Sequence, residues 1–371
     1  MNEFSRAATA PAPDPMHHDG PPSSGPSGET ADPTAQESAD HPRAGGEPAV
    51  QEVERVDAWK KVRKLAIKQL DRFMSLEPKV LSGDSPDAIH DLRVASRRLQ
   101  QVLDLIYPRP RPPEIRKLRC KIRRCRRVLG EVRNCDVQLA RVERTLSAKR
   151  AARREAWDAV HHYIRQRRVE HFEKALKKIS KVNMAVFYVH LKAHLAGNVI
   201  AHAAAYLPVT EESGPEKFSE RIGRSLETVW QALETQIAQS HGDPRAGVIH
   251  GVRIAAKRVR YLIEVVDAFD VSGSREALRW LRSLQTHLGN WHDVEVLEQM
   301  MIEMLARQEF LRDQLPIAMG IEKLILRNRK GKESFKEKYF AMTRDSGDYD
   351  RVKEWVSGMV AGPEKAFGIE N

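Results

Sequence analysis

The residues best suited to chemistry form two matching rows of basic side chains, 160 residues apart. Residues 89–106 read IHDLRVASRRLQQVLDLI, and residues 249–269 read IHGVRIAAKRVRYLIEVVDAF. In each segment a His is followed by basic residues at i+3, i+7 and i+8: His90, Arg93, Arg97 and Arg98, then His250, Arg253, Lys257 and Arg258. Arg offers forked donors to phosphate oxygens and Lys a compact charge, so these rows could bind a polyanion.

Each row must lie on one face of a helix for its members to act together. At 3.6 residues per turn, positions i, i+3 and i+7 share a face, and the opposite face of both segments is apolar. An ordinary solvated helix face would explain one such segment. Cations at this spacing repel one another without interleaved acids, however, and a solubilising face needs no His. The repetition therefore indicates an internal duplication of an anion-binding helix.

Composition also points to an acidic partner. The chain carries a formal charge of +11, with a pI near 9.5. Residues 1–50 contain eight acidic and two basic residues, so the remainder carries +17. The same segment holds nine of the 20 prolines and few large apolar side chains, and we expect it to be a disordered acidic tail. It lacks the basic start and apolar core of a signal peptide.

Two other features of the sequence indicate the cellular compartment. No run of 18 apolar residues occurs, so we expect no membrane span. Three cysteines, Cys120, Cys125 and Cys135, lie in a Lys/Arg-rich stretch without obvious pairing. Their number and spacing favour small buried thiols in a reducing compartment over a disulfide or metal site. We therefore expect a cytoplasmic protein.

Apolar residues recur at helical spacing beyond residue 50, which predicts an all-α fold of two pseudo-symmetric antiparallel bundles with long helices. We expect a first repeat at 51–210, a second at 211–345 and a C-terminal tail at 346–371. The helices expected beside the two His segments lie at 55–76, 114–129, 131–196 (one helix, or two with a break near 148–153), 184–206, 216–239, 275–288 and 349–360. Ser85 or Asp87 is the expected cap of the first His helix.

A second landmark also occurs twice. Leu129-Gly130 is followed by Arg133-Asn134, and Leu288-Gly289 is followed by His292-Asp293. We expect each Gly to end a helix and Asn134 and Asp293 to cap the next one.

Together, the paired I-H-x-x-R-[VI]-A-x-[RK]-R segments and the Leu-Gly landmarks resemble the CHAD domain family, whose name abbreviates conserved histidine α-helical domain. The resemblance covers roughly residues 52–345. It implies two helical bundles around a basic channel that binds inorganic polyphosphate without catalysis. It also implies association with polyphosphate granules and possible contact with other granule proteins. Many relatives carry an N-terminal triphosphate-tunnel enzyme domain, but this sequence has no strand-rich region to match it, which favours a stand-alone module.

The resemblance assigns polyphosphate binding to basic residues of the His segments and of the helices after them. These are His90, Arg93, Arg97, Arg98, Arg116, Arg119, Arg123 and Arg126 in the first half, and His250, Arg253, Lys257, Arg258, Arg275, Arg279 and Arg282 in the second. The halves differ where Asn134 corresponds to Asp293 and Arg133 to His292. These differences argue against any function that would require identical residues at these positions in both halves.

A metal-dependent phosphohydrolase is one alternative, because His90-Asp91 and His292-Asp293 are HD dipeptides. Such an enzyme needs further His and Asp ligands that converge on a metal, whereas the neighbours here are basic and repel a divalent cation. His190 and His194 have zinc-like spacing but no adjacent Glu or third ligand. We therefore expect neither a metal nor another cofactor, and no catalytic residue.

Nucleic-acid binding is the closer alternative, since any phosphate polymer would be attracted. Aromatic content is only 6%, and no groove-reading motif occurs. Trp59, Trp157, Trp230 and Trp280 are expected in packed positions. The sequence thus predicts at most weak or non-specific binding of nucleic acid.

Overall fold

Helices make up nearly all of the described chain, because apolar residues recur at helical spacing between short runs of helix breakers. The computed structural model describes residues 48–83, 85–148, 153–196, 217–344 and 346–367. No strand occurs in these ranges, so the expected all-α fold is confirmed. The tail expected at residues 1–50 lies outside the described residues as far as residue 47, and α1 begins at Pro48.

The first bundle contains α1 (Pro48–Ser82), α2 (Pro86–Ile106), α3 (Pro113–Val128) and α6 (Met184–Ala196). Helix α2 carries the first His segment. Ser85 caps it, as expected, by accepting a hydrogen bond of 3.1 Å from the Ala88 N–H. Leu92, Leu99 and Leu103 are buried on the apolar side of α2, which leaves the basic residues on its other side.

The second bundle contains α8 (Phe218–Gly242), α9 (Ala246–Asp267), the first part of α10 (Ser274–Leu305), α13 (Gly347–Ala361) and α14 (Pro363–Ala366). Helix α9 carries the second His segment and buries Val252, Val259 and Leu262. The helix expected near 349–360 is α13, which packs against α8 and α10. Residues beyond the expected second repeat thus complete this bundle.

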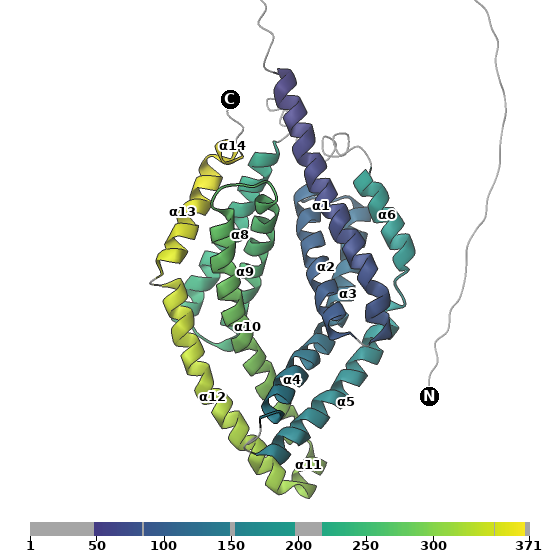
Figure 1. The fold of residues 1–371 in the computed structure, drawn as a ribbon, viewed down its shortest axis with the longest axis vertical. Helices are drawn as coiled ribbons and strands as arrows, with labels where there is room; N and C mark the ends of the chain where they lie inside the picture. The colour runs from purple at the N-terminus through teal and green to yellow at the C-terminus, as the bar shows by residue number, and fades with distance from the viewer. Residues whose placement is uncertain (1–47, 84, 149–152, 197–216, 345, 368–371) are drawn as a thin grey trace, which may run out of the picture. The chain divides into compact units, whose positions relative to one another are not determined.

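A separate apolar cluster joins the two halves at the end of the molecule shown lowest in Figure 1. It is built by α4 (Gly130–Leu146), α5 (Arg154–Ile179), the last part of α10, α11 (Gln308–Asp313) and α12 (Leu315–Thr343). Val142, Ile164, Met301 and Ile321 are buried within it. Because α4 and α5 come from the first half and α10 and α12 from the second, this cluster fixes how the halves are oriented.

The bundles also meet through α2 and α9, which lie beside each other, and through α1 and α8. Figure 1 shows α2 and α9 on the inner sides of the two bundles. The rings of Trp59 and Phe218 form an edge contact at 5.1 Å between α1 and α8. Apolar contacts of this kind place the two His helices opposite each other.

Two expectations about helix boundaries were wrong. Gly289 lies inside α10, although α3 does end at Val128, just before Leu129-Gly130, as expected. Gly130 is already the first residue of α4, so Asn134 lies within α4 and Asp293 within α10, and neither caps a helix. A glycine inside a helix costs only about 1 kcal/mol relative to alanine. Burial of Leu288 and Trp291 on either side outweighs that cost in α10.

The stretch 131–196 is broken where expected, since α4 ends at Leu146 and α5 begins at Arg154. A further break separates α5 from α6 between residues 179 and 184, so α6 begins where the helix expected at 184–206 starts. Residues 197–206 of the expected helix 184–206 lie outside the described ranges. The three cysteines are free. Among the described helices, none is long and apolar enough to cross a membrane.

Candidate functional site

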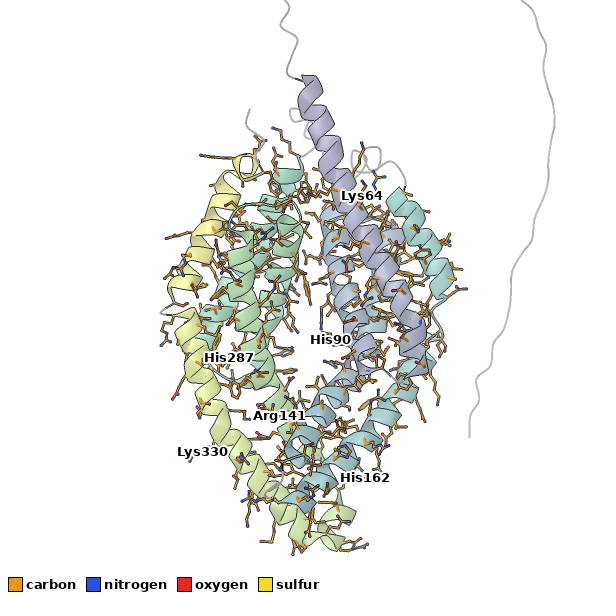
Figure 2. All side chains as sticks on the ribbon, viewed as in Figure 1. Lys64, His90, Arg141, His162, His287 and Lys330 are labelled. Carbon is orange, nitrogen blue, oxygen red and sulfur yellow. The ribbon has the colours of Figure 1, made fainter. Side chains whose placement is uncertain are left out.

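The basic faces of α2 and α9 point toward each other and form one cluster. The pKa of Lys257 on α9 is lowered by burial and then by Arg253, Arg97 and Arg93, so cations of both helices lie within electrostatic reach of it. Figure 2 shows His90 on the side of α2 that faces α9. We call the following set the central cation cluster: Arg93, Arg97, Arg126, Arg133, Arg253 and Lys257.

Helices α2 and α3 hold the first-half arginines in place. Arg93 donates to the backbone carbonyl of Arg126, and Arg126 donates to Oε1 of Gln100. Gln100 in turn donates through Nε2 to the Arg119 carbonyl at 3.1 Å. Burial and neighbouring arginines lower the pKa of Arg93 and of Arg126 to about 10. These two guanidinium groups are therefore positioned, partly desolvated and still charged at neutral pH.

The basic groups that α9 contributes to the cluster are also buried, but they have fewer hydrogen-bond partners. Burial and surrounding cations lower the pKa of Lys257 to about 6, so its amine is largely neutral at pH 7 in the ligand-free protein. Nε of Arg253 and Nδ1 of His250 are buried and have no hydrogen-bond partner among the described residues. The His250 and His292 rings lie 4.9 Å apart, and burial with nearby cations lowers the pKa of His292 to about 3. An unpaired buried N–H, such as Nε of Arg253, is costly, and an anion would satisfy it.

Two carboxylates lie among these cations. Asp293 on α10 is close to Arg253, Arg141 and Arg133, yet burial raises its pKa above the ordinary value. Glu264 on α9 accepts a hydrogen bond from Nε of Arg98 on α2 at 2.7 Å. The site thus combines an excess of cations with two internal anions.

The structure gathers some of the expected binding residues and separates others. Arg93, Arg97, Arg126, Arg253 and Lys257 belong to the cluster, and His90, Arg98, Arg119, Arg123 and His250 border it. Four others are exposed on α3 and α9 or on the outer part of α10: Arg116, Arg258, Arg279 and Arg282. Arg275 is also exposed there and pairs with Asp267 and Asp270.

The exposed arginines of α10 line a hollow of about 550 Å³ together with Asp267, Glu276 and Leu278. Arg279 pairs with Glu276 at 3.1 Å, with both side chains more than 70% exposed. Acids therefore offset part of the positive charge of this surface, which contrasts with the central cation cluster. Ion pairs this exposed contribute little to stability.

The sequence alone did not assign four further residues to the site: Arg133, Arg141, His292 and Asp293. Burial lowers the pKa of Arg141, and the carboxylate of Asp293 opposes this shift more strongly than any other charged group acts on it. Figure 2 shows Arg141 on α4, in the part of the molecule where α4 lies beside α10. The duplicated Leu-Gly landmark contains three of these four residues, so it was the signal that could have revealed them.

The HD dipeptides occupy different surroundings. Asp91 pairs with Arg72 at 2.6 Å, whereas Asp293 lies among arginines. Within the described ranges, no three His, Cys, Asp or Glu side chains are grouped as metal ligands. Asp91 is therefore held in an ion pair, and Asp293 lies within the electrostatic influence of several cations.

Comparisons with known proteins agree with this architecture. A family model described as the CHAD domain matches residues 64–301. The crystal structure of the CHAD domain from the plant Ricinus communis is similar, with a TM-score of 0.53 and 19% identity over 81% of this chain and 91% of that one. A second solved structure, PptA from Streptomyces chartreusis, gives a TM-score of 0.52 and 14% identity over 80% of this chain and 99% of that one. Comparison with curated proteins gives no match.

Proposed function

Because the chain belongs to the CHAD domain family, we propose that it binds inorganic polyphosphate between its two helical bundles and catalyses no reaction. The observation that carries this proposal is the central cation cluster, in which half-buried basic groups from α2, α3, α4 and α9 face one another. Facing cations destabilise the ligand-free protein, and a bound polyanion would remove that repulsion. The site is therefore matched to a ligand with many closely spaced negative charges.

Polyphosphate fits this site better than nucleic acid does. Binding of single-stranded nucleic acid commonly relies on aromatic rings on which bases stack. The aromatic residue nearest the cluster on α9, Tyr261, is only 5% exposed and its ring is covered by Arg260 at 4.8 Å. Trp157, Trp230 and Trp280 are buried in the apolar cores. Polyphosphate has no bases, so the absence of an exposed aromatic ring at this site does not reduce its affinity.

The test is binding of labelled long-chain polyphosphate, with single-stranded DNA, RNA and short phosphates as competitors, over a range of salt concentrations. Two triple variants each replace three basic side chains with glutamine. Arg93→Gln/Arg253→Gln/Lys257→Gln alters the central cation cluster, and the matched control Arg275→Gln/Arg279→Gln/Arg282→Gln alters the outer surface of α10.

We expect the cluster variant to lose binding while it remains folded by circular dichroism, and the control to retain most of its affinity. Each phosphate contact releases counterions, so log affinity decreases linearly with log salt. In the cluster variant this slope should be less steep by about two. Equal losses in both variants, or equal competition by nucleic acid, would leave only a non-specific basic surface and would contradict the proposal.

Polyphosphate binding also suggests a location. We propose that the protein acts in the cytoplasm at polyphosphate granules, where it would meet other granule proteins. Fluorescence microscopy of the wild-type protein and the cluster variant, with polyphosphate stained in the same cells, tests this. Diffuse signal from the wild type in cells with visible granules would contradict it.

A further inference from the structure

Glu264 is the one carboxylate on α9 that bridges to the other bundle. Its Oε2 accepts a hydrogen bond from Nε of Arg98 on α2 at 2.7 Å, and its Oε1 lies 3.4 Å from Nε of Arg260 on its own helix. The Glu264 and Arg260 side chains are only 17% and 19% exposed. One carboxylate therefore contacts guanidinium groups from both bundles, as a bound phosphate would.

The arginines held by Glu264 border the central cation cluster. Arg98 directly follows Arg97 on α2, and Arg260 is one of the cations that lower the pKa of Lys257. Arg260 lies three residues after Lys257, about 4.5 Å farther along α9. A polyanion that fills the cluster and continues along α9 would next meet these two guanidinium groups.

The corresponding carboxylate of the first half does something else. Asp104 corresponds to Glu264 in the sequence repeat, but it pairs with Arg111 at 2.9 Å and with Arg119, both within its own bundle. Arg258, which corresponds to Arg98, is exposed and has no ion pair among the described residues. The bridge between bundles therefore exists on one side only, so it is not a simple result of the repeated sequence.

We propose that Glu264 is an internal competitor for the polyanion: its carboxylate occupies Arg98 and Arg260 in the ligand-free protein, and a bound phosphate chain displaces it. This inference rests on the proposed function of the cluster and assigns a specific residue to control of its affinity. Displacement exchanges one carboxylate for several phosphates, which favours a long chain because a single phosphate offers little to offset the lost ion pair. Glu264 thereby selects for polymeric ligands.

The test is a set of affinities for long-chain polyphosphate and for tripolyphosphate. Glu264→Gln and Glu264→Ala remove the charge with and without retention of the side-chain shape. Glu276→Gln is the matched control, because it makes the same change in net charge on the exposed outer part of α10. Thermal unfolding of each variant verifies that it is folded.

We expect both Glu264 variants to bind polyphosphate about tenfold more tightly, as one charge-assisted contact would give. The ratio of the affinity for long-chain polyphosphate to the affinity for tripolyphosphate should become smaller. Glu276→Gln should change the affinity less than twofold. Arg98→Gln should have little effect in the wild type, where Glu264 holds that guanidinium, and should cost about tenfold in the Glu264→Gln background.

The outcomes separate the two ideas. Wild-type protein that fails to bind polyphosphate would overturn the proposed function and, with it, this inference. Wild-type binding with no gain in either Glu264 variant, or with the same gain in Glu276→Gln, would overturn the role of Glu264 alone. Equal effects of Arg98→Gln in the two backgrounds would do the same, because they would show that Glu264 does not compete for Arg98.

Discussion

The two sides of the central cation cluster hold their charges differently. On the side of α2, α3 and α4 every member is an arginine, and the nearby carboxylate of Asp104 is paired within its own bundle. On the side of α9 and α10, Lys257 corresponds to Arg97, two histidines lie close by, and the carboxylates of Asp293 and Glu264 face the cluster. The first side is permanently charged, whereas the second can change its charge with pH and with ligand.

This difference indicates that the two His helices, although their sequences are similar, have different roles in the site. Even with pKa values lowered to about 10, Arg93 and Arg126 keep their protons over the physiological range, so we expect the first side to attract a polyanion throughout that range. The amine of Lys257, in contrast, must gain a proton before it contributes charge. We therefore expect the first side to supply most of the affinity and the second side to adjust it.

The largest effect should come from substitution of the matched pair Arg97 and Lys257. At pH 8, Arg97→Gln should weaken polyphosphate binding by roughly 100-fold, the value of a strong charge-assisted hydrogen bond. Lys257→Gln should weaken it by less than about tenfold. The wild-type lysine must be protonated on binding at pH 8, and the free energy of that step offsets part of its contribution to affinity. Fluorescence anisotropy with labelled polyphosphate measures both. Equal losses would mean that the two sides of the cluster are equivalent.

A smaller effect is expected from pH itself. A bound polyanion raises the pKa of Lys257 from about 6 toward the ordinary value, so the complex holds more protons than the free protein above pH 6. Affinity should therefore fall as pH rises from 6 to 8, at least tenfold in total and by no more than about tenfold per unit for this one proton. The histidines and Asp293 act in the same direction, since an anion also raises their pKa values.

Lys257→Arg is the variant that isolates this proton. An arginine there is charged at both pH values, so most of the dependence between pH 6 and 8 should disappear. Calorimetry in buffers of different ionisation enthalpy should detect proton uptake by the wild type and less by the variant. A variant with the full wild-type pH profile would place the titrating group elsewhere.

The repeated segments allowed the helical fold and both rows of cations to be predicted, because helical periodicity and side-chain charge are local properties of a sequence. The sequence did not reveal that Gly289 lies within a helix, since the outcome depended on burial of Leu288 and Trp291 against distant residues. It also did not separate Arg126, which enters the cluster, from Arg279, which pairs with an acid on the surface. Both arginines follow a His segment, and only tertiary packing distinguishes their surroundings.

The two sides of the cluster should also differ in how substitutions change the free energy of unfolding of the ligand-free protein, with opposite signs on the two sides. Lys257→Met removes a buried amine from among cations and should stabilise the protein by about 1 kcal/mol at pH 7. Arg93→Met removes the hydrogen bond to the Arg126 carbonyl and should destabilise it by about 1 kcal/mol. Denaturant unfolding at low salt without polyphosphate measures both changes.

The pH dependence of the Lys257→Met gain provides its control. The pKa of Lys257 is lowered in the folded protein, so the unfolded chain binds more protons between pH 6 and the ordinary lysine value, and wild-type stability rises with pH in this window. The advantage of the methionine variant should therefore shrink from pH 7 toward pH 10. A constant advantage would point to better packing rather than to removal of the free-energy cost of deprotonating Lys257 on folding.

The smallest effect concerns the starts of the two His helices. Ser85 caps α2 through its side chain, whereas Arg245 at the same position of α9 makes no capping bond and pairs with Asp243 at the surface. Ser85→Ala should destabilise the protein by about 1 kcal/mol, and Arg245→Ala should leave the cap of α9 unchanged. Polyphosphate affinity should not change in either variant, because neither residue reaches the cluster. A loss of affinity in Ser85→Ala alone would show that fraying of α2 moves His90 and Arg93, and would make the first side the one whose helix must be held in place.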